Sequence, residues 1–102
     1  MYKLIAIDLD GTLLNSYGQI SEKNKLALNN AKEKGIQIVL ASGRTTDSVK
    51  SIANEIGVQN YIICGNGSLI YDLQKEEIIY DKFIEKKKAL QIIDICEKNS
   101  IY

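Results

Sequence analysis

Three short apolar runs, separated by two stretches of helical periodicity, constrain the fold of this chain most strongly. The runs cover residues 3–8, 36–40 and 61–64, and each ends in polar or glycine-containing sequence. Runs of this length, apolar on both faces, are typical of buried strands in a parallel sheet. Because a strand–helix–strand–helix–strand order closes through right-handed crossovers, the sequence predicts an α/β fold with three parallel strands.

The two stretches between the runs carry clear helix boundaries. The first helix is expected over residues 22–34, with Ser21 as its N-cap and Gly35 as its end. The second runs from residue 46 or 47 to Gly57. The inward faces are expected to use Ala27, Leu28 and Ala31 in the first helix, and Val49, Ile52, Ala53 and Ile56 in the second.

After the third run the pattern changes to a hairpin and one last helix. Gly65, Asn66 and Gly67 form a turn signal, and residues 68–73 and 77–81 alternate like the arms of a β-hairpin. Residues 86–98 have helical periodicity. The expected inward face of this helix contains Leu90, Ile92, Ile93 and Cys96.

The composition narrows the class of molecule. The 102 residues suit one small domain, and balanced charge argues against a nucleic-acid partner. No apolar run approaches the roughly 20 residues of a membrane span, and the chain enters a strand pattern at once. We therefore expect no membrane partner and no signal peptide. Cys64 and Cys96 lie in apolar runs without metal-ligand spacing, which indicates reduced, buried thiols in a cytoplasmic protein.

Two carboxylates at the end of the first run are the strongest candidates for chemistry. Histidine is absent, so catalysis has to use carboxylates, hydroxyls, amides, lysine or arginine. Asp8 ends the first run, and Asp10 and Gly11 follow it, at the sheet edge where open α/β folds bind ligands. Two carboxylates this close repel each other, and Mg²⁺ is a usual counter-ion.

The acid pair has two other interpretations. A calcium-binding loop needs a glycine at position six and an acid at position twelve. Counted from Asp8, those positions hold Leu13 and Gln19, so this interpretation fails. The second alternative, in which Asp8 and Asp10 merely cap the end of a strand, stays open.

Three segments, in order along the chain, resemble a known family. Residues 8–12 (Asp-Leu-Asp-Gly-Thr) are similar to the first motif of the haloacid dehalogenase-like phosphohydrolase superfamily, and residues 41–44 (Ala-Ser-Gly-Arg) resemble its second motif. Residues 65–68 (Gly-Asn-Gly-Ser), followed by a hairpin, resemble the lead into the α/β cap of the Cof-type sugar-phosphate phosphatases. The resemblance covers essentially the whole chain.

The resemblance implies a domain plan. Residues 1–66 would form the first part of a Rossmann-like parallel sheet, holding strands one to three of the core. Residues 67–81 would be a connecting hairpin, and residues 82–102 would begin the α/β cap. The implied strand order, 5-4-1-2-3, leaves the first strand at an edge in this chain, so we also expect self-association through residues 4–7.

The resemblance also implies residue roles. Asp8 would be the nucleophile that attacks phosphorus, and Asp10 the general acid and then the base. Mg²⁺ would lie on the Asp8 carboxylate and the Asp10 backbone carbonyl. The phosphoryl oxygens would be bound by Ser42 and by backbone N–H groups of Leu9, Gly11 and Gly43. Arg44 and Asn66 would contact the substrate.

The later members of this set also have structural interpretations. Ser42 and Gly43 are residues that punctuate many turns, and Asn66 precedes a glycine as in many turns. Arg44 is equally suited to pair with an acid on a neighbouring helix. The sequence leaves both sets of interpretations open.

The family's third and fourth motifs, which supply a lysine and further aspartates, are missing from these residues. We therefore expect the N-terminal part of a longer Mg²⁺-dependent phosphohydrolase that acts on small phosphorylated metabolites through an aspartyl-phosphate, and that is inactive as this part alone. The alternative is a non-enzymatic phosphate- or metal-binding module with a role in assembly.

Overall fold

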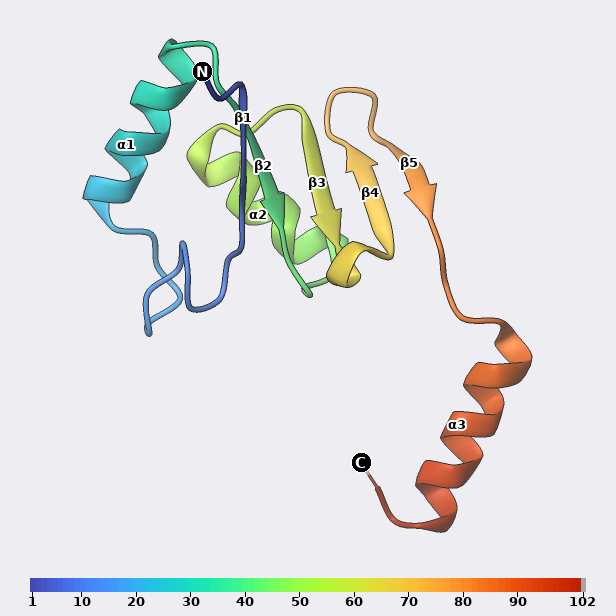
Figure 1. Cartoon of the computed structure of the whole chain (residues 1–102). Helices are drawn as coiled ribbons and strands as arrows, with labels where there is room; N and C mark the ends of the chain where they lie inside the picture. Colours follow the sequence, from blue (N-terminus) through green and yellow to red (C-terminus); the bar gives the residue numbers. More distant parts are fainter. Residues whose placement is uncertain (102) are drawn as a thin grey trace.

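The three expected strands lie side by side and run parallel. In the computed structural model, which describes residues 1–101, β1 (Leu4–Ile7), β2 (Gln37–Ala41) and β3 (Tyr61–Cys64) pair in that order. Ile7 lies opposite Leu40, and Ala41 lies opposite Ile63. The carboxyl ends of the three strands therefore meet at one edge of the sheet, to which the arrows of β2 and β3 point in Figure 1.

Both crossover helices form where the sequence predicts them. α1 (Glu22–Glu33) begins after Ser21, whose side-chain oxygen accepts a hydrogen bond from the Asn24 N–H at 3.1 Å. α2 (Thr46–Ile56) ends at Gly57, which takes a left-handed φ of 68°. α1 packs on β2, α2 packs on β3, and the two helices contact each other, so they cover the same face of the sheet.

The core lies between these helices and the sheet. It is formed by side chains from α1, α2, β2, β3 and the loops after β1 and α2: Leu9, Leu13, Leu14, Ile20, Leu28, Ile38, Leu40, Val49, Ala53, Ile56, Val58, Ile62 and Cys64. Ile52 and Ala31 pack against it as expected, whereas Ala27 is exposed, so its predicted inward position is wrong. Ala27 lies at the edge of the stripe that Leu28 and Ala31 define, on the side of Ala31 and about 100° around the helix from the buried Leu28.

The expectation that β1 is buried on both faces is also wrong. Ile5 and Ile7 pack against the core, but Leu4 and Ala6 are exposed. The cause is the topology: α1 and α2 both lie on one face, and β1 forms an edge of the sheet, as expected.

The hairpin continues the same sheet. β4 (Leu69–Asp72) runs antiparallel to β3, and β5 (Glu77–Asp81) runs antiparallel to β4, giving the strand order β1-β2-β3-β4-β5. The Asp72 carboxylate holds the turn between them, because it accepts hydrogen bonds from the N–H groups of Gln74 and Lys75 at 2.9 and 3.0 Å. A short 3-10 turn, η1 (Gly65–Gly67), connects β3 to β4.

The last helix has the predicted bounds but not the predicted burial. α3 (Lys86–Lys98) lies apart from the sheet, beyond an extended segment (Figure 1). Leu90, Ile92 and Ile93 are more than half exposed, because no other element of the described residues packs along α3. Cys96 is only half-buried, while Cys64 is buried. Among residues 1–101 no helix has the length and apolarity to cross a bilayer. Tyr102 is outside the described residues, and the cytoplasmic location stays a prediction.

Candidate active site

The loop after β1 exposes two carboxylates on either side of a buried leucine. Leu9 is fully buried, and its carbonyl accepts hydrogen bonds from the N–H groups of Thr12 and Leu14 at 3.1 and 2.9 Å. This tight return of the chain leaves Asp8 and Asp10 at the surface. Gly11 has a φ of 76° in the left-handed region, where a residue with a side chain is strained.

Asp8 keeps most of its hydrogen-bonding capacity free for a ligand. Its Oδ2 accepts one hydrogen bond from the Thr12 hydroxyl, at 3.3 Å, and the residue is exposed. An ionised carboxylate has about four lone-pair positions. The hydrogen bond from Thr12 therefore orients the Asp8 carboxylate, and most lone-pair positions of that carboxylate remain available to a ligand.

The loop after β2 is built around a buried serine. Ser42 is 6% exposed, its N–H donates to the Ile63 carbonyl at 2.9 Å, and its own carbonyl accepts from the Asn66 N–H at 3.1 Å. The Ser42 hydroxyl oxygen accepts from the Arg44 N–H at 3.1 Å. Because that bond uses a lone pair, the hydroxyl proton of Ser42 remains free to be donated.

Gly43 and Asn66 fit closely against each other. A Cβ on Gly43 would lie 2.8 Å from the side-chain oxygen of Asn66, which is closer than such contacts occur. Asn66 itself has a left-handed φ of 55°, a conformation that asparagine tolerates better than most residues. A side chain at position 43 would therefore require the Asn66 side chain to shift.

These loops enclose a cavity of about 320 Å³ at the carboxyl edge of the parallel strands. Its lining residues are Asp8, Ala41, Ser42, Gly43, Ile63, Asn66 and Gly67. Four of these, Asp8, Ser42, Gly43 and Asn66, are candidates from the sequence. The remaining three lie beside those candidates on β2, β3 and η1 and do not carry chemistry that the sequence could flag.

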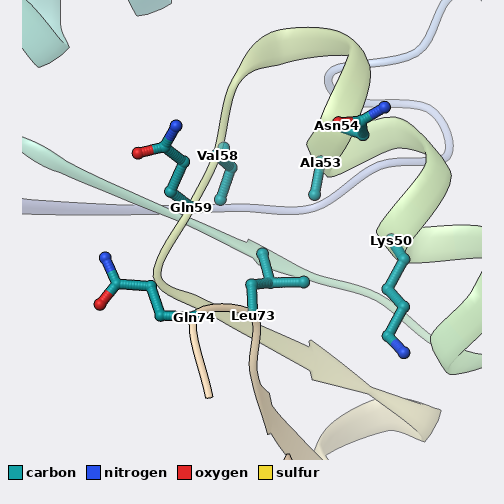
Figure 2. A pocket seen from close by; sticks show the side chains of 7 residues that line it. All are labelled: Lys50, Ala53, Asn54, Val58, Gln59, Leu73 and Gln74. Carbon is teal, nitrogen blue, oxygen red and sulfur yellow. The ribbon is translucent and has the colours of Figure 1, made fainter. Parts of the chain in front are cut away.

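A second cavity, of about 350 Å³, lies at the opposite end of β3, between α2 and the β4–β5 turn (Figure 2). It is lined by Lys50, Ala53, Asn54, Val58, Gln59, Leu73 and Gln74. The Lys50 ammonium lies 3.9 Å from the centre of the Tyr71 ring, so a partner already occupies it. This cavity contains no carboxylate and none of the residues that the sequence predicts for the site.

Asp10 is not in the cavity but in a two-point ion pair with Arg44. The Arg44 Nε donates to Asp10 Oδ2 at 2.8 Å, and Nη2 donates to Oδ1 at 2.6 Å. Hydrogen bonding from Arg44 holds the pKa of the Asp10 carboxyl below its usual value. The remaining terminal nitrogen, Nη1, donates to the Ser48 hydroxyl at 3.2 Å. The alternative of an ion pair for Arg44 is thus realised, with an acid of the β1 loop instead of a helix.

Two residues of this arrangement were not predicted as site residues. Thr12 orients Asp8, and its signal was its place in the same five-residue motif. Ser48, in the first turn of α2, accepts a hydrogen bond from Arg44, which precedes that helix. Leu9 contributes a buried side chain and Gly11 a turn, and the phosphate contacts of their backbone N–H groups stay predictions.

The donor set matches part of a Mg²⁺ shell. Exposed carboxylate and carbonyl oxygens are the hard ligands that this ion prefers, and Asp8 has oxygen positions free. Among residues 1–101 no group of three or more His, Cys, Asp or Glu side chains is placed to hold a metal ion. Asp8 therefore fits as one ligand of such an ion.

Comparison with known proteins agrees with this geometry. The profile of the haloacid dehalogenase-like hydrolase family matches residues 5–102. The chain is 41% identical over 100 residues to "Phosphatase YwpJ" of Bacillus subtilis, covering 98% of this chain and 35% of that protein. A second similar protein, "5-amino-6-(5-phospho-D-ribitylamino)uracil phosphatase YcsE" of the same organism, is 43% identical over 70 residues, 69% of this chain and 28% of the other.

Solved structures share the fold. A haloacid dehalogenase-like hydrolase from Bacteroides thetaiotaomicron superposes with a TM-score of 0.87 at 35% identity, over 98% of this chain and 39% of the other. One from Bacillus subtilis has a TM-score of 0.84 at 41% identity, over 96% and 34%. The chain thus spans about a third of the length of the relatives that it matches. The chain belongs to the haloacid dehalogenase-like hydrolase family, and it corresponds to the N-terminal part of its relatives.

Proposed function

We propose that the protein carrying this chain is a phosphatase that hydrolyses small phosphorylated metabolites, such as sugar phosphates, through an aspartyl-phosphate on Asp8. The observation that supports this most is that Asp8 lines the same cavity as Ser42, Gly43 and Asn66. Phosphoryl transfer depends mainly on positioning and on stabilisation of charge, and this cavity offers a carboxylate opposite polar donors. The names of the similar proteins, which are phosphatases, support the reaction class.

In the proposed first step an Asp8 oxygen attacks phosphorus, and the bond from phosphorus to the leaving alcohol oxygen breaks. Asp10 gives its proton to that oxygen. In the second step water attacks the phosphorus of the aspartyl-phosphate and gives a proton back to Asp10, which releases phosphate and restores the Asp8 carboxylate. Each acid ends the cycle in the state in which it began.

Binding of the phosphoryl group is assigned to the neighbours of Asp8. The free hydroxyl proton of Ser42 would be donated to a phosphoryl oxygen, together with backbone N–H groups of Leu9, Gly11 and Gly43. Asn66, beside Gly43, would contact the substrate. Mg²⁺, held by the Asp8 carboxylate and the Asp10 backbone carbonyl, would supply positive charge that offsets repulsion between Asp8 and the phosphate.

The Asp10–Arg44 pair fits this cycle as a resting arrangement. The lowered pKa keeps Asp10 ionised, which suits the base of the second step but not the acid of the first. A substrate phosphate that attracts Arg44 would weaken its hold on Asp10, and the negative charge of the phosphate would raise the pKa of Asp10, which favours the protonated form that the first step needs. Arg44 would therefore contact Asp10 when no substrate is bound, and would contact the phosphate when substrate is bound.

The domain plan is part of the proposal. Residues 1–66 would be the first part of the catalytic core, residues 67–81 the connecting hairpin, and residues 82–102 the beginning of a cap. The position of α3, apart from the sheet at the end of an extended segment, supports a boundary near residue 82 (Figure 1).

The test compares two substitutions in the natural polypeptide that carries this chain. Asp8→Asn removes the nucleophile, so we expect release of inorganic phosphate from sugar phosphates to fall by about a thousandfold or more. Asp10→Asn is expected to retain phosphate binding and to slow both steps. Asp81→Asn, an exposed acid on β5, makes the same chemical change away from the cavity and serves as the control. Near-normal turnover by Asp8→Asn would contradict the proposal.

The ion pair that holds the Asp10 carboxylate on Arg44, outside the cavity, favours one other candidate, a module that binds phosphate or a metal ion without turnover. The two candidates differ in what the natural polypeptide does with a phosphate ester. Binding without any Mg²⁺-dependent release of phosphate would favour the module. The 102 residues alone are expected to hydrolyse esters poorly in either case, because removal of one electrostatic donor typically costs about a hundred- to a thousandfold.

A further inference from the structure

Each side-chain nitrogen of Arg44 donates a hydrogen bond. Its Nε, Nη2 and Nη1 atoms donate to Asp10 Oδ2, Asp10 Oδ1 and Ser48 Oγ at 2.8, 2.6 and 3.2 Å. Its backbone N–H donates to Ser42 Oγ, and its carbonyl accepts from the Gly65 N–H, both at 3.1 Å. A planar guanidinium in this position is a preorganised fork for one carboxylate.

The contact with Arg44 gives Asp10 and its neighbour Asp8 different numbers of hydrogen bonds. Each oxygen of Asp10 accepts a hydrogen bond from Arg44, at 2.8 and 2.6 Å, whereas Asp8 accepts one hydrogen bond, from Thr12 at 3.3 Å. Two unoccupied carboxylates two residues apart would attract the same divalent cation, because each offers oxygen ligands and negative charge. An acid drawn into that shell is no longer placed to exchange a proton with a substrate.

We propose that Arg44 is a positioning residue that keeps the Asp10 carboxylate out of the coordination shell of a divalent cation bound at Asp8. The inference rests on the proposed function, since it assigns the cation to Asp8 and the proton transfer to Asp10. Arg44 acts through Asp10 and not on the cation itself. The pair joins the loop after β1 to the loop after β2, across 34 residues of sequence, so the division of roles follows from the fold.

An ordinary surface ion pair would not have this consequence, and the chain contains one for comparison. On α3, Lys98 Nζ lies 2.7 Å from Asp94 Oδ2, in a single contact between exposed side chains. Asp94 has no second acid two residues away that is left free, because its i+2 neighbour is Cys96. Loss of that pair is therefore expected to leave cation binding unchanged.

The experiment measures Mn²⁺ affinity by water proton relaxation, in the natural polypeptide that carries this chain and without substrate. Arg44→Gln is expected to tighten Mn²⁺ binding by roughly tenfold, because it frees a second carboxylate beside the cation. Arg44→Lys keeps the charge and loses the fork, so a smaller tightening is expected. Lys98→Gln is the control and should have no effect.

A double-mutant cycle separates release of the carboxylate from simple loss of a positive charge. If Asp10 is the new ligand, Arg44→Gln will have no effect on Mn²⁺ affinity in an Asp10→Asn background. Tightening that persists in that background, or no tightening by Arg44→Gln in the original protein, would overturn the proposal. Phosphate release is measured separately, so failure of the proposed function at Asp8→Asn is distinguishable from failure of this cycle.

Discussion

α2 and α3 carry similar stripes of apolar residues, yet only α2 buries its stripe. Val49 and Ala53 in α2 are essentially inaccessible, while Leu90 and Ile93 in α3 are about half exposed. α2 connects two neighbouring strands and packs on the sheet, whereas α3 follows an extended segment and has no layer beside it among residues 1–101 (Figure 1). Periodicity thus reports that a helix has an apolar face, and the rest of the fold decides whether that face is covered.

The largest expected difference between the two regions is in the cost of removing an apolar side chain. Ile62→Ala, at a fully buried site on β3, should lower the free energy of unfolding by about 2–5 kcal/mol. Ile93→Ala makes the same change on α3, where the side chain is 52% exposed, and should cost less than about 1 kcal/mol. Urea unfolding of both variants checks this, and equal costs would show that α3 is packed in solution.

The next prediction concerns the close contact inside the site. Gly43→Ala would place a Cβ 2.8 Å from the Asn66 side-chain oxygen, so Asn66 has to shift, and we expect a loss of stability of about 1 kcal/mol or less and weaker phosphate binding. In an Asn66→Gly background the obstacle is gone, and the same substitution should cost much less. Thermal unfolding measures both steps. Equal costs in the two backgrounds would refute the contact as the reason for the glycine.

The third prediction concerns the uncovered edge of the sheet. β1 offers an unpaired strand edge with Leu4 and Ala6 exposed beside it, and such edges pair with other chains. We expect the isolated 102 residues to self-associate at micromolar concentration in light scattering, and Leu4→Lys to reduce this association. Ile93→Lys adds the same charge on α3 and tests whether that helix is responsible instead. A stable monomer with slow amide exchange in β1 would contradict the prediction.

The smallest effect is expected from the ion pair between α1 and α2. Lys25 Nζ lies 2.9 Å from Glu55 Oε1, and this hydrogen bond raises the pKa of Lys25 above its ordinary 10.5. A raised pKa of a cation contributes stability below pH 10.5, and this contribution is lost as the pH rises through the higher value. Thermal midpoints of the original protein and of Lys25→Gln should therefore converge above that pH. A constant difference between them would argue against the pair.

The sequence predicts secondary structure and the site loops well because both follow from local chemistry. Ser21 forms the expected cap, Gly57 ends α2 in the left-handed conformation, and β3 has the expected bounds. The cavity gathers Asp8 and Ser42 because parallel strands bring their carboxyl ends together. These features depend on neighbours in sequence or on the direction of a strand, which the pattern specifies.

What the sequence did not predict depends on three-dimensional neighbours. Leu4 and Ala6 are exposed because α1 and α2 cover the other face of the sheet. The residue types of a strand do not indicate which face the helices will cover. The pair of Arg44 with Asp10 forms between two loops that are far apart in sequence. The residues around Arg44 therefore do not indicate which acid it pairs with. The same reason applies to the exposed apolar face of α3, because helical periodicity does not show whether another element covers that face.

The most direct test of the account is to identify the residue that carries the phosphoryl group. The natural polypeptide that contains this chain is mixed with a sugar phosphate and Mg²⁺, quenched in acid within one turnover, and digested for mass spectrometry. We expect a phosphoryl group on the peptide that contains Asp8, and we expect no phosphoryl group on the corresponding peptide of Asp8→Asn. Turnover at a normal rate with this peptide unmodified, and with Asp8→Asn still active, would contradict the assignment of Asp8 as the nucleophile.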